Sequence, residues 1–330
     1  MRLRTTIAIL FGIGLSLPGG CPPNTAPADL TPVQSDLSGI YVTTGNSVAV
    51  FALDASGNAA PKRVISGVST GMSLPIGVAS DTQNNLYVAN RTGSTVTVYP
   101  LGADGDTTPT RTLTAAGMGS PEGLAVGPGD DLFVATCPTC GSGGGGESGI
   151  FHFSNNALTS DFKIGGTTNT NTGFTGPASI ALDENRNLFV ANVFGGNVQV
   201  FPPGASGDTL PIRSFSPGAS LNVQAMAYGN NAVFLSVPGG VINQYVATVT
   251  GNVTPSSAIT SSSISVQYPA GIAVDTSVTP PVIYLADYFG DAILVIQTAG
   301  IAPFLTVSNV TTISGSATGL DGPLGLLVVK

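Results

Sequence analysis

The segment PIGVAS at residues 75–80, followed by NLYVAN at 85–90, is the first complete copy of an internal repeat. Related pairs follow as PEGLAV and DLFVAT (121–126, 131–136), PASIAL and NLFVAN (177–182, 187–192), VQAMAY and AVFLS (223–228, 232–236), PAGIAV and VIYLAD (269–274, 282–287), with a half-copy PLGLLV at 323–328. The copies start at 75, 121, 177, 223, 269 and 323, so the spacings are 46, 56, 46, 46 and 54 residues. Periods of this length are typical of propellers, solenoids and other arrays.

A second motif follows the repeat with the same period. YPLGADGDTTPTR at 99–111 matches FPPGASGDTLPIR at 201–213 and FALDASGNAAPKR at 51–63. Each copy joins an aromatic strand end to a Gly with Asp or Asn and then to Pro. Gly permits positive φ and Asp or Asn bonds its own backbone, so this combination predicts a hairpin connection.

Each unit contains four short apolar runs, for example at 77–80, 86–90, 95–99 and 111–114. Four strands in about 46 residues are typical of a propeller blade. A β-sandwich is the alternative for an all-β chain of this length, but it does not predict a repeating unit. The sequence therefore predicts an all-β propeller of four-stranded blades.

The two ends of the repeat region complement each other. Residues 39–43 (GIYVT) align with the second strand of a unit, whereas 323–328 form a first strand without followers. Together they predict one blade built from both termini, which closes the ring and removes open sheet edges. We expect six blades: residues 39–70 with 318–330, then blades starting near 71, 117, 173, 219 and 264.

The combination of a Pro-x-Gly strand with Tyr-Val-Ala-Asp/Asn resembles the NHL repeat over residues 39–330. The fifth unit, with IYLAD at 283–287, is most similar to that family, and the fourth, with VFLS at 233–236, least. The resemblance implies a six-bladed propeller. It implies no particular activity, because NHL-like propellers include protein-binding and RNA-binding scaffolds, lyases and lactonase-like enzymes.

Composition agrees with short strands and many turns. Charged residues make up only 8%, there are 44 Gly and 24 Pro and no Trp, and the apolar residues show no 3.6-residue period. We expect almost no helix outside the N-terminal leader.

Removing residues 1–20 would leave 8 basic and 18 acidic residues, a net charge of −10. Such an acidic surface repels nucleic acid, so DNA and RNA are excluded as expected partners.

The first residues predict export. A basic start with Arg2 and Arg4, an apolar run at 5–17 and small residues before Cys21 indicate a signal peptide over 1–20. LPGGC at 17–21 resembles a bacterial lipobox, with acylation of Cys21, although Pro18 departs from the usual pattern. The alternative is cleavage further on, after Ala28. Residues 21–38, rich in Pro, Ala and Thr, are predicted to form an extended tether, and 39–330 the propeller.

The candidate ligand site lies where the second strands end. In a four-stranded blade these ends share one face with the loops that enter the next blade, and that face has few charges. We expect Asn90, Arg91, Asn192 and Asp287 to line a pocket for a neutral polar ligand. The alternative is that the Asn and Asp side chains cap their strand-to-loop turns. No cofactor and no metal ligand are predicted, although oxygen ligands leave Ca²⁺ open.

The third unit contains the insertion CPTCGSGGGGESG at 137–149. There is no second CxxC pair to complete a zinc site and no helix to lower a thiolate pKa. In an exported chain, a disulfide between Cys137 and Cys140 is expected instead. Closing so short a loop contributes about 2 kcal/mol on the chain-entropy estimate.

No catalytic residue is predicted. His152 is the single histidine and alternates with aromatic residues in IFHF at 150–153, as in a strand. Streptogramin-lyase-like and peptide-amidating-lyase-like propellers need several histidines.

The sequence therefore favours an exported, lipid-anchored binding or scaffolding module over an enzyme. Its expected partner is a protein, peptide or glycan, and the expected state is a monomer in the cell envelope, periplasmic or outer-surface, or secreted. The alternative is a Ca²⁺-dependent lactonase-like hydrolase in the central channel.

Overall fold

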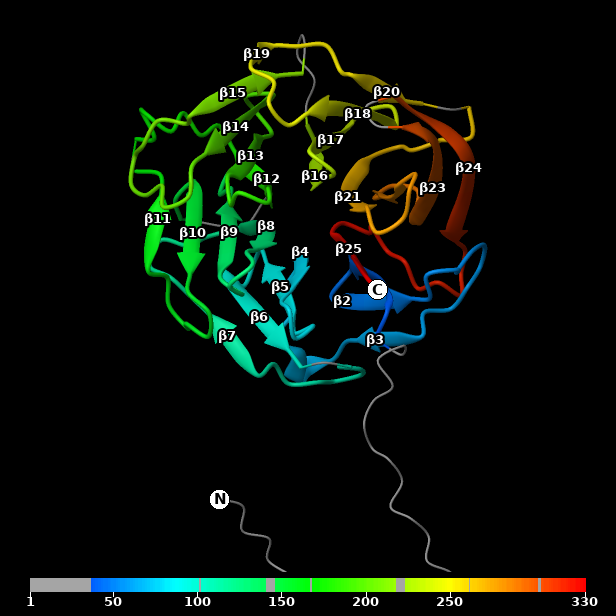
Figure 1. Ribbon diagram of the computed structural model, residues 1–330. Helices are drawn as coiled ribbons and strands as arrows, with labels where there is room; N and C mark the ends of the chain where they lie inside the picture. Colours follow the sequence, from blue (N-terminus) through cyan, green and yellow to red (C-terminus); the bar gives the residue numbers. More distant parts are fainter. Residues whose placement is uncertain are drawn as a thin grey trace, which may run out of the picture. The chain divides into compact units, whose positions relative to one another are not determined.

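The computed structural model describes residues 37–100, 102–140, 146–166, 168–217, 223–260, 262–301 and 304–330. The predicted signal peptide, Cys21 and all but the last two residues of the predicted tether lie outside these ranges. From Leu37 onward the chain forms six antiparallel sheets around a central channel (Figure 1). The predicted all-β, six-bladed propeller is confirmed.

Each blade has four strands, ordered from the channel outward. Blade one is β25 (Leu326–Val329), β1 (Gly39–Thr44), β2 (Ser47–Phe51) and β3 (Arg63–Ile65); blade two is β4 (Pro75–Ser80), β5 (Leu86–Asn90), β6 (Thr95–Tyr99) and β7 (Arg111–Leu113); blade three is β8 (Pro121–Val126), β9 (Leu132–Thr136), β10 (Gly149–Phe153) and β11 (Phe162–Ile164). Blade four is β12 (Pro177–Leu182), β13 (Leu188–Asn192), β14 (Asn197–Phe201) and β15 (Arg213–Ser216); blade five is β16 (Ala225–Gly229), β17 (Ala232–Val237), β18 (Val241–Val246) and β20 (Ser257–Ile259); blade six is β21 (Pro269–Asp275), β22 (Val282–Asp287), β23 (Ala292–Ile301) and β24 (Phe304–Ser314).

The ring closes through the C-terminal strand. β25 pairs antiparallel with β1, from Gly39 opposite Val329 to Val42 opposite Leu326. This pairing places the half-copy of the repeat as the innermost strand of blade one, as expected. The one described helical segment is a 3₁₀ turn, η2 (Val68–Thr70), and none of the described helices is long and apolar enough to cross a membrane.

The hydrophobic core lies between neighbouring blades. Six clusters of buried side chains are present, and each combines residues of two adjacent blades. In β5, Tyr87 and Ala89 pack toward blade three, whereas Leu86 and Val88 pack toward blade one. The strands are thus buried on both faces, which explains why they are apolar throughout instead of alternating with polar residues.

The Pro-x-Gly part of the repeat sets the distance between innermost strands. A Cβ atom added to Gly77 would lie 2.1 Å from the carbonyl oxygen of Glu122, and one added to Gly271 would lie 1.9 Å from that of Leu324. Gly123 and Gly325 face their neighbours in the same way. Glycine is required at these positions because another backbone approaches closely, not because of positive φ.

The second motif links each blade to the preceding one at the outer edge. Gly105, in the loop between β6 and β7, donates its N–H to the carbonyl of Val64 at 2.8 Å and accepts from the N–H of Ser66 at 3.0 Å. Asp106 then accepts from the N–H of Ser69 at 2.7 Å, in the segment that leads to β4. We call this contact, a motif glycine bridged to the last strand of the preceding blade, the outer clasp.

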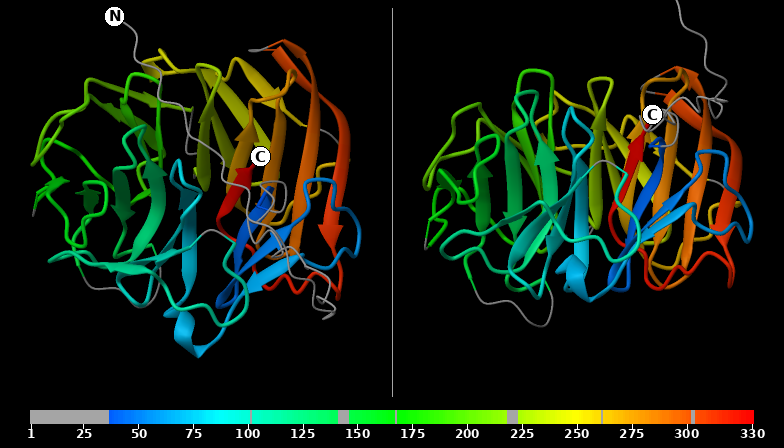
Figure 2. Two further views of the ribbon diagram at one scale, coloured as in Figure 1. Left: turned by 60° about the horizontal axis from the view of Figure 1, so that its bottom comes forward. Right: turned by 90° about the horizontal axis from the view of Figure 1, so that it is seen from below.

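Outer clasps recur around most of the ring. Gly57 and Gly207 form equivalent parallel bridges, and Asn58 and Asp208 occupy the position of Asp106. Blade five contains a further copy of the second motif, YVATVTGNVTP at 245–255, which was not among the predicted copies. Its Gly251 and Asn252 form β19 against β15. In blade six, Ile313 of β24 receives the bridge from Gly57, whereas no described residue of this blade forms a bridge back to blade five. Blade six has the longest described strands, β23 and β24 (Figure 2).

Candidate functional site at the channel mouth

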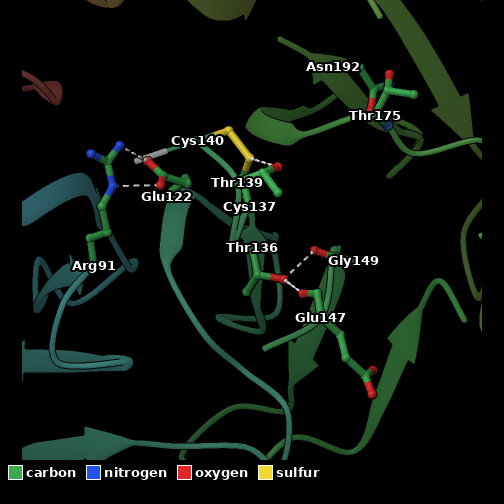
Figure 3. Close-up of a disulfide and its surroundings, with 10 residues drawn as sticks. All are labelled: Arg91, Glu122, Thr136, Cys137, Thr139, Cys140, Glu147, Gly149, Thr175 and Asn192. Atoms are coloured by element: carbon green, nitrogen blue, oxygen red, sulfur yellow. Dashed lines mark hydrogen bonds and ion pairs between the residues drawn. A yellow bond between two sulfur atoms is a disulfide. The ribbon is translucent and has the colours of Figure 1, made fainter. Parts of the chain in front are cut away.

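Two of the predicted ligand residues, Asn90 and Asn192, end the second strands of blades two and four and are fully buried. Asn90 accepts from the backbone N–H of Ser73 at 3.2 Å, and Asn192 accepts from that of Thr175 at 3.0 Å (Figure 3). The amide group of Asn192 donates to Gln199 at 2.9 Å. Both side chains thus hold the loop that enters their own blade.

Asp287 has the same position in blade six. It accepts from the backbone N–H groups of Gln267 at 3.0 Å and Tyr268 at 2.8 Å. None of the three strand-end residues lines the channel cavity. The geometry corresponds to the capping alternative, and a ligand-binding role for Asn90, Asn192 and Asp287 stays a prediction.

Arg91, the fourth predicted ligand residue, does line the channel cavity. Its guanidinium forms a bidentate ion pair with Glu122 of blade three, Nε to Oε1 at 2.7 Å and Nη2 to Oε2 at 2.6 Å (Figure 3). The side chain of Glu122 is 4% exposed and that of Arg91 19%. Burial raises the pKa of Glu122, and the ion pair with Arg91 opposes that shift.

The insertion of blade three begins at the same mouth. Cys137 and Cys140 form a disulfide, with Cys137 buried and Cys140 lining the cavity beside Arg91 and Glu122 (Figure 3). The N–H of Cys137 donates to the carbonyl of Ser120 at 3.1 Å. The disulfide therefore sits on backbone that is anchored to the loop entering β8. Residues 141–145 of the insertion lie outside the described ranges.

The cavity has a volume of about 740 Å³ and is bounded by the innermost strands of all six blades. Its walls consist mostly of glycine, alanine and aliphatic side chains, and Arg91 and Glu122 are the charged residues among its described lining. Innermost strands are sheet edges, and part of their backbone is bonded to side chains of neighbouring strands. Thr43 Oγ1 donates to the carbonyl of Ile76 at 2.7 Å, and Ser179 Oγ accepts from the N–H of Met226 at 3.0 Å. The site thus combines apolar walls with a few polar groups, as ligand pockets commonly do.

Aromatic side chains of blades four and six also face the mouth. Tyr268 lines the cavity, and its ring centroid lies 6.1 Å from that of Tyr288 and 5.6 Å from that of Phe289. Phe194, which follows the second strand of blade four, also lines the cavity and is 60% exposed. None of these four residues was among the predicted site residues. A signal was present, because Phe194, Tyr288 and Phe289 come within two residues of the capping Asn192 and Asp287, as Arg91 follows Asn90.

His152 lies outside the cavity lining. Its ring nitrogens face Asp131 at 3.0 Å and Asp161 at 3.1 Å, and its ring stacks on Phe162 with centroids 4.3 Å apart. Asp131 also pairs with Arg186 of the next blade. The histidine is therefore part of a polar network between blades three and four. Across the described ranges, no group of three or more His, Cys, Asp and Glu side chains is placed to hold a metal ion.

No family model and no curated protein matches the sequence. The solved structures that resemble the fold include the following two. One is a catalytically inactive virginiamycin B lyase from Staphylococcus aureus with quinupristin, 13% identical, covering 79% of this chain and 76% of the lyase, with a TM-score of 0.52. The other is a protein of unknown function from Bacteroides caccae, 11% identical, covering 88% and 97%, with a TM-score of 0.58. The likeness shows a shared fold. At these identities it supplies no activity or ligand for this chain.

Proposed function

We propose that this propeller is an exported binding module that holds a protein segment, a peptide or a glycan at the channel mouth. The observation that supports the proposal is the juxtaposition of exposed aromatic rings and one ion pair over a cavity of about 740 Å³. Large exposed aromatic side chains are uncommon on surfaces without a partner, and they are enriched where binding energy is concentrated.

Catalysis receives less support from the same residues. Glu122 is the one carboxylate among the described cavity-lining residues, and it is engaged with Arg91 on two hydrogen bonds. General acid–base hydrolysis needs a second positioned acid or base, and a Ca²⁺ site needs several oxygen ligands. The similar lyase structure contains quinupristin by its description, but the fold alone links the two proteins. The Ca²⁺-dependent hydrolase has no specific observation in its favour.

The proposal also includes export and a membrane anchor. We infer an NHL-like repeat protein with a signal peptide at 1–20, acylation at Cys21 and a tether over 21–38 that displays the propeller at the cell envelope. A disulfide between Cys137 and Cys140 is compatible with an oxidising compartment outside the cytosol. Labelling with a radioactive fatty acid, compared between the wild type and Cys21→Ala, tests the anchor directly.

Site-specific cross-linking tests the binding role. A photoreactive phenylalanine analogue at Phe194, in the mouth, should give cross-linked products in the native envelope. The same analogue at Leu158, which is 55% exposed on the outer loop of blade three, is the matched control. Equal labelling from both positions would argue against a site at the mouth. A melting temperature unchanged by millimolar Ca²⁺ would in turn count against the hydrolase.

A further inference from the structure

The exposed aromatic residues are concentrated at one place. Five aromatic side chains are strongly exposed in the described ranges: Phe194, Tyr268, Tyr288, Phe289 and Phe304. Phe194 and Tyr268 line the cavity, and Tyr288 and Phe289 contact the ring of Tyr268. Their exposed fractions run from 37% for the two tyrosines to 63% for Phe289. We call these four residues the aromatic border: Tyr268, Tyr288 and Phe289 contact one another on blade six, and Phe194 is a separate exposed ring on blade four.

The Arg91–Glu122 pair faces the same space from blades two and three. Burial raises the pKa of Tyr268, Arg91 lowers it and Glu122 raises it, so the tyrosine hydroxyl lies within electrostatic reach of both charges. Because the two charges are joined by two hydrogen bonds, the pair is neutral as a unit and still offers polar edges. The mouth therefore presents aromatic faces and hydrogen-bonding groups together, without a net charge of its own.

The charge of the whole chain limits the ligand further. The chain has a net charge of −8, which repels an anionic ligand. The guanidinium of Arg91 is already neutralised by Glu122, so an anion would find no free cation among the described lining residues. A purely apolar ligand would offer no hydrogen-bond partner to the polar edges of the Arg91–Glu122 pair or to the hydroxyl of Tyr268. The fitting ligand is neutral, with apolar faces and many hydroxyl groups at its edges.

We propose that the channel mouth binds a neutral oligosaccharide, whose sugar faces pack on the rings of Phe194, Tyr268 and Phe289 and whose hydroxyls bond to Arg91 and Glu122. This inference rests on the proposed binding function and specifies its ligand class. The C–H groups of a pyranose ring form an apolar face that packs on aromatic rings, while its equatorial hydroxyls point sideways to polar partners. A cavity of about 740 Å³ is large enough for the end of a chain of several sugars.

Calorimetric titration of the full chain with defined hexasaccharides tests this inference. The neutral probes are cellohexaose, maltohexaose, xylohexaose and the hexamer of N-acetylglucosamine; the anionic probe is hexagalacturonate; a capped, uncharged hexapeptide with two phenylalanines represents the peptide class. We expect at least one neutral sugar to bind with Kd below ~1 mM, and Phe194→Ala and Phe289→Ala to weaken that binding about tenfold or more. Phe304→Ala, which truncates a ring in β24 that is 73% exposed and has no place in the mouth, should leave it unchanged.

The outcomes separate this inference from the proposed function. No binding of any neutral sugar, tighter binding of hexagalacturonate, or equal losses in Phe289→Ala and Phe304→Ala would each overturn the oligosaccharide. If the peptide binds instead and mouth variants weaken it, the oligosaccharide is refuted while the binding function stands. If Phe194 also gives no more cross-linking than Leu158, the binding function falls with it. Phe194 and Phe289 are exposed, so their truncation should preserve the fold, which unchanged melting temperatures would verify.

Discussion

Gly271→Ala tests whether close backbone approach at the channel holds the ring together. Gly271 lies in β21, where an added Cβ would be 1.9 Å from the carbonyl oxygen of Leu324, just before β25. An ordinary carbon–oxygen contact between strands is about 3.3 Å, so the two strands would have to separate by roughly 1.4 Å. Both contacting atoms belong to backbone, and neither can rotate away.

The expected destabilisation follows from that displacement. Overpacking a well-ordered interior typically costs about 1–3 kcal/mol, and the rigid neighbours place Gly271→Ala near the upper value. Replacing glycine also restricts the unfolded chain, which offsets about 0.4–1 kcal/mol. A net loss of about 2 kcal/mol should lower the melting temperature by roughly 3 °C, because the unfolding entropy of about 290 residues is near 0.6 kcal/mol/K.

Differential scanning calorimetry provides the measurement, with Gly129→Ala as the matched control. An added Cβ at Gly129 would meet only Asp131 Oδ1, at 3.8 Å, so its melting temperature should change little. If Gly271→Ala melts within a degree of the wild type, the innermost strands do not depend on glycine for their spacing. Equal decreases in the two variants would show that loss of glycine, not contact with Leu324, is responsible.

Three further predictions concern other parts of the ring. Deleting residues 321–330 removes β25, so the truncated chain should unfold or self-associate through the exposed edge of β1; a monomer with an unchanged melting temperature on size-exclusion and thermal analysis would contradict the closure. Burial acts to raise the pKa of Asp131, but hydrogen bonds from Arg186 and His152 outweigh it and hold the pKa below its ordinary value. This stabilisation is present above the unfolded-state pKa of about 3.9 and is lost as pH falls through the lower folded pKa. The wild type should therefore melt at a higher temperature than Asp131→Asn at pH 5, and this difference should shrink towards pH 3. A constant difference across that range would refute the assignment. Reducing the Cys137–Cys140 disulfide should cost no more than about 2 kcal/mol, because the loop is short, and a larger fall in stability measured in denaturant titrations would mean that the insertion supports the whole ring.

The fold could be predicted because the repeated residues have a direct structural role. Glycines such as Gly77 and Gly123 mark innermost strands, since no side chain fits there. The Gly-Asp and Gly-Asn pairs mark outer clasps, although their role in joining neighbouring blades became visible only in the structure. The copy with Gly251 was missed because its flanking residues had diverged, whereas the backbone contact that it makes had not.

The channel mouth was harder to predict because its residues lie in turns whose residue type varies from blade to blade. Asn90, Asn192 and Asp287 attracted attention by recurring, and in these three blades the recurring residue caps a turn. Phe194 and Phe289 both come two residues after the capping residue, but blade two has Thr92 at that position, so the fold does not impose an aromatic residue there. In a repeat protein, positions shared by all blades are therefore informative about the fold, and the exposed departures from the repeat are better candidates for function.

The side chains around the channel mouth differ from blade to blade. Blades two and three contribute the Arg91–Glu122 pair and the disulfide, whereas blades four and six contribute the aromatic border. The three turns that follow the capping Asn90, Asn192 and Asp287 carry different side chains, although their strand ends are capped in the same way. A mouth whose polar and aromatic groups come from different blades can orient an elongated ligand across it, which a symmetric mouth could not.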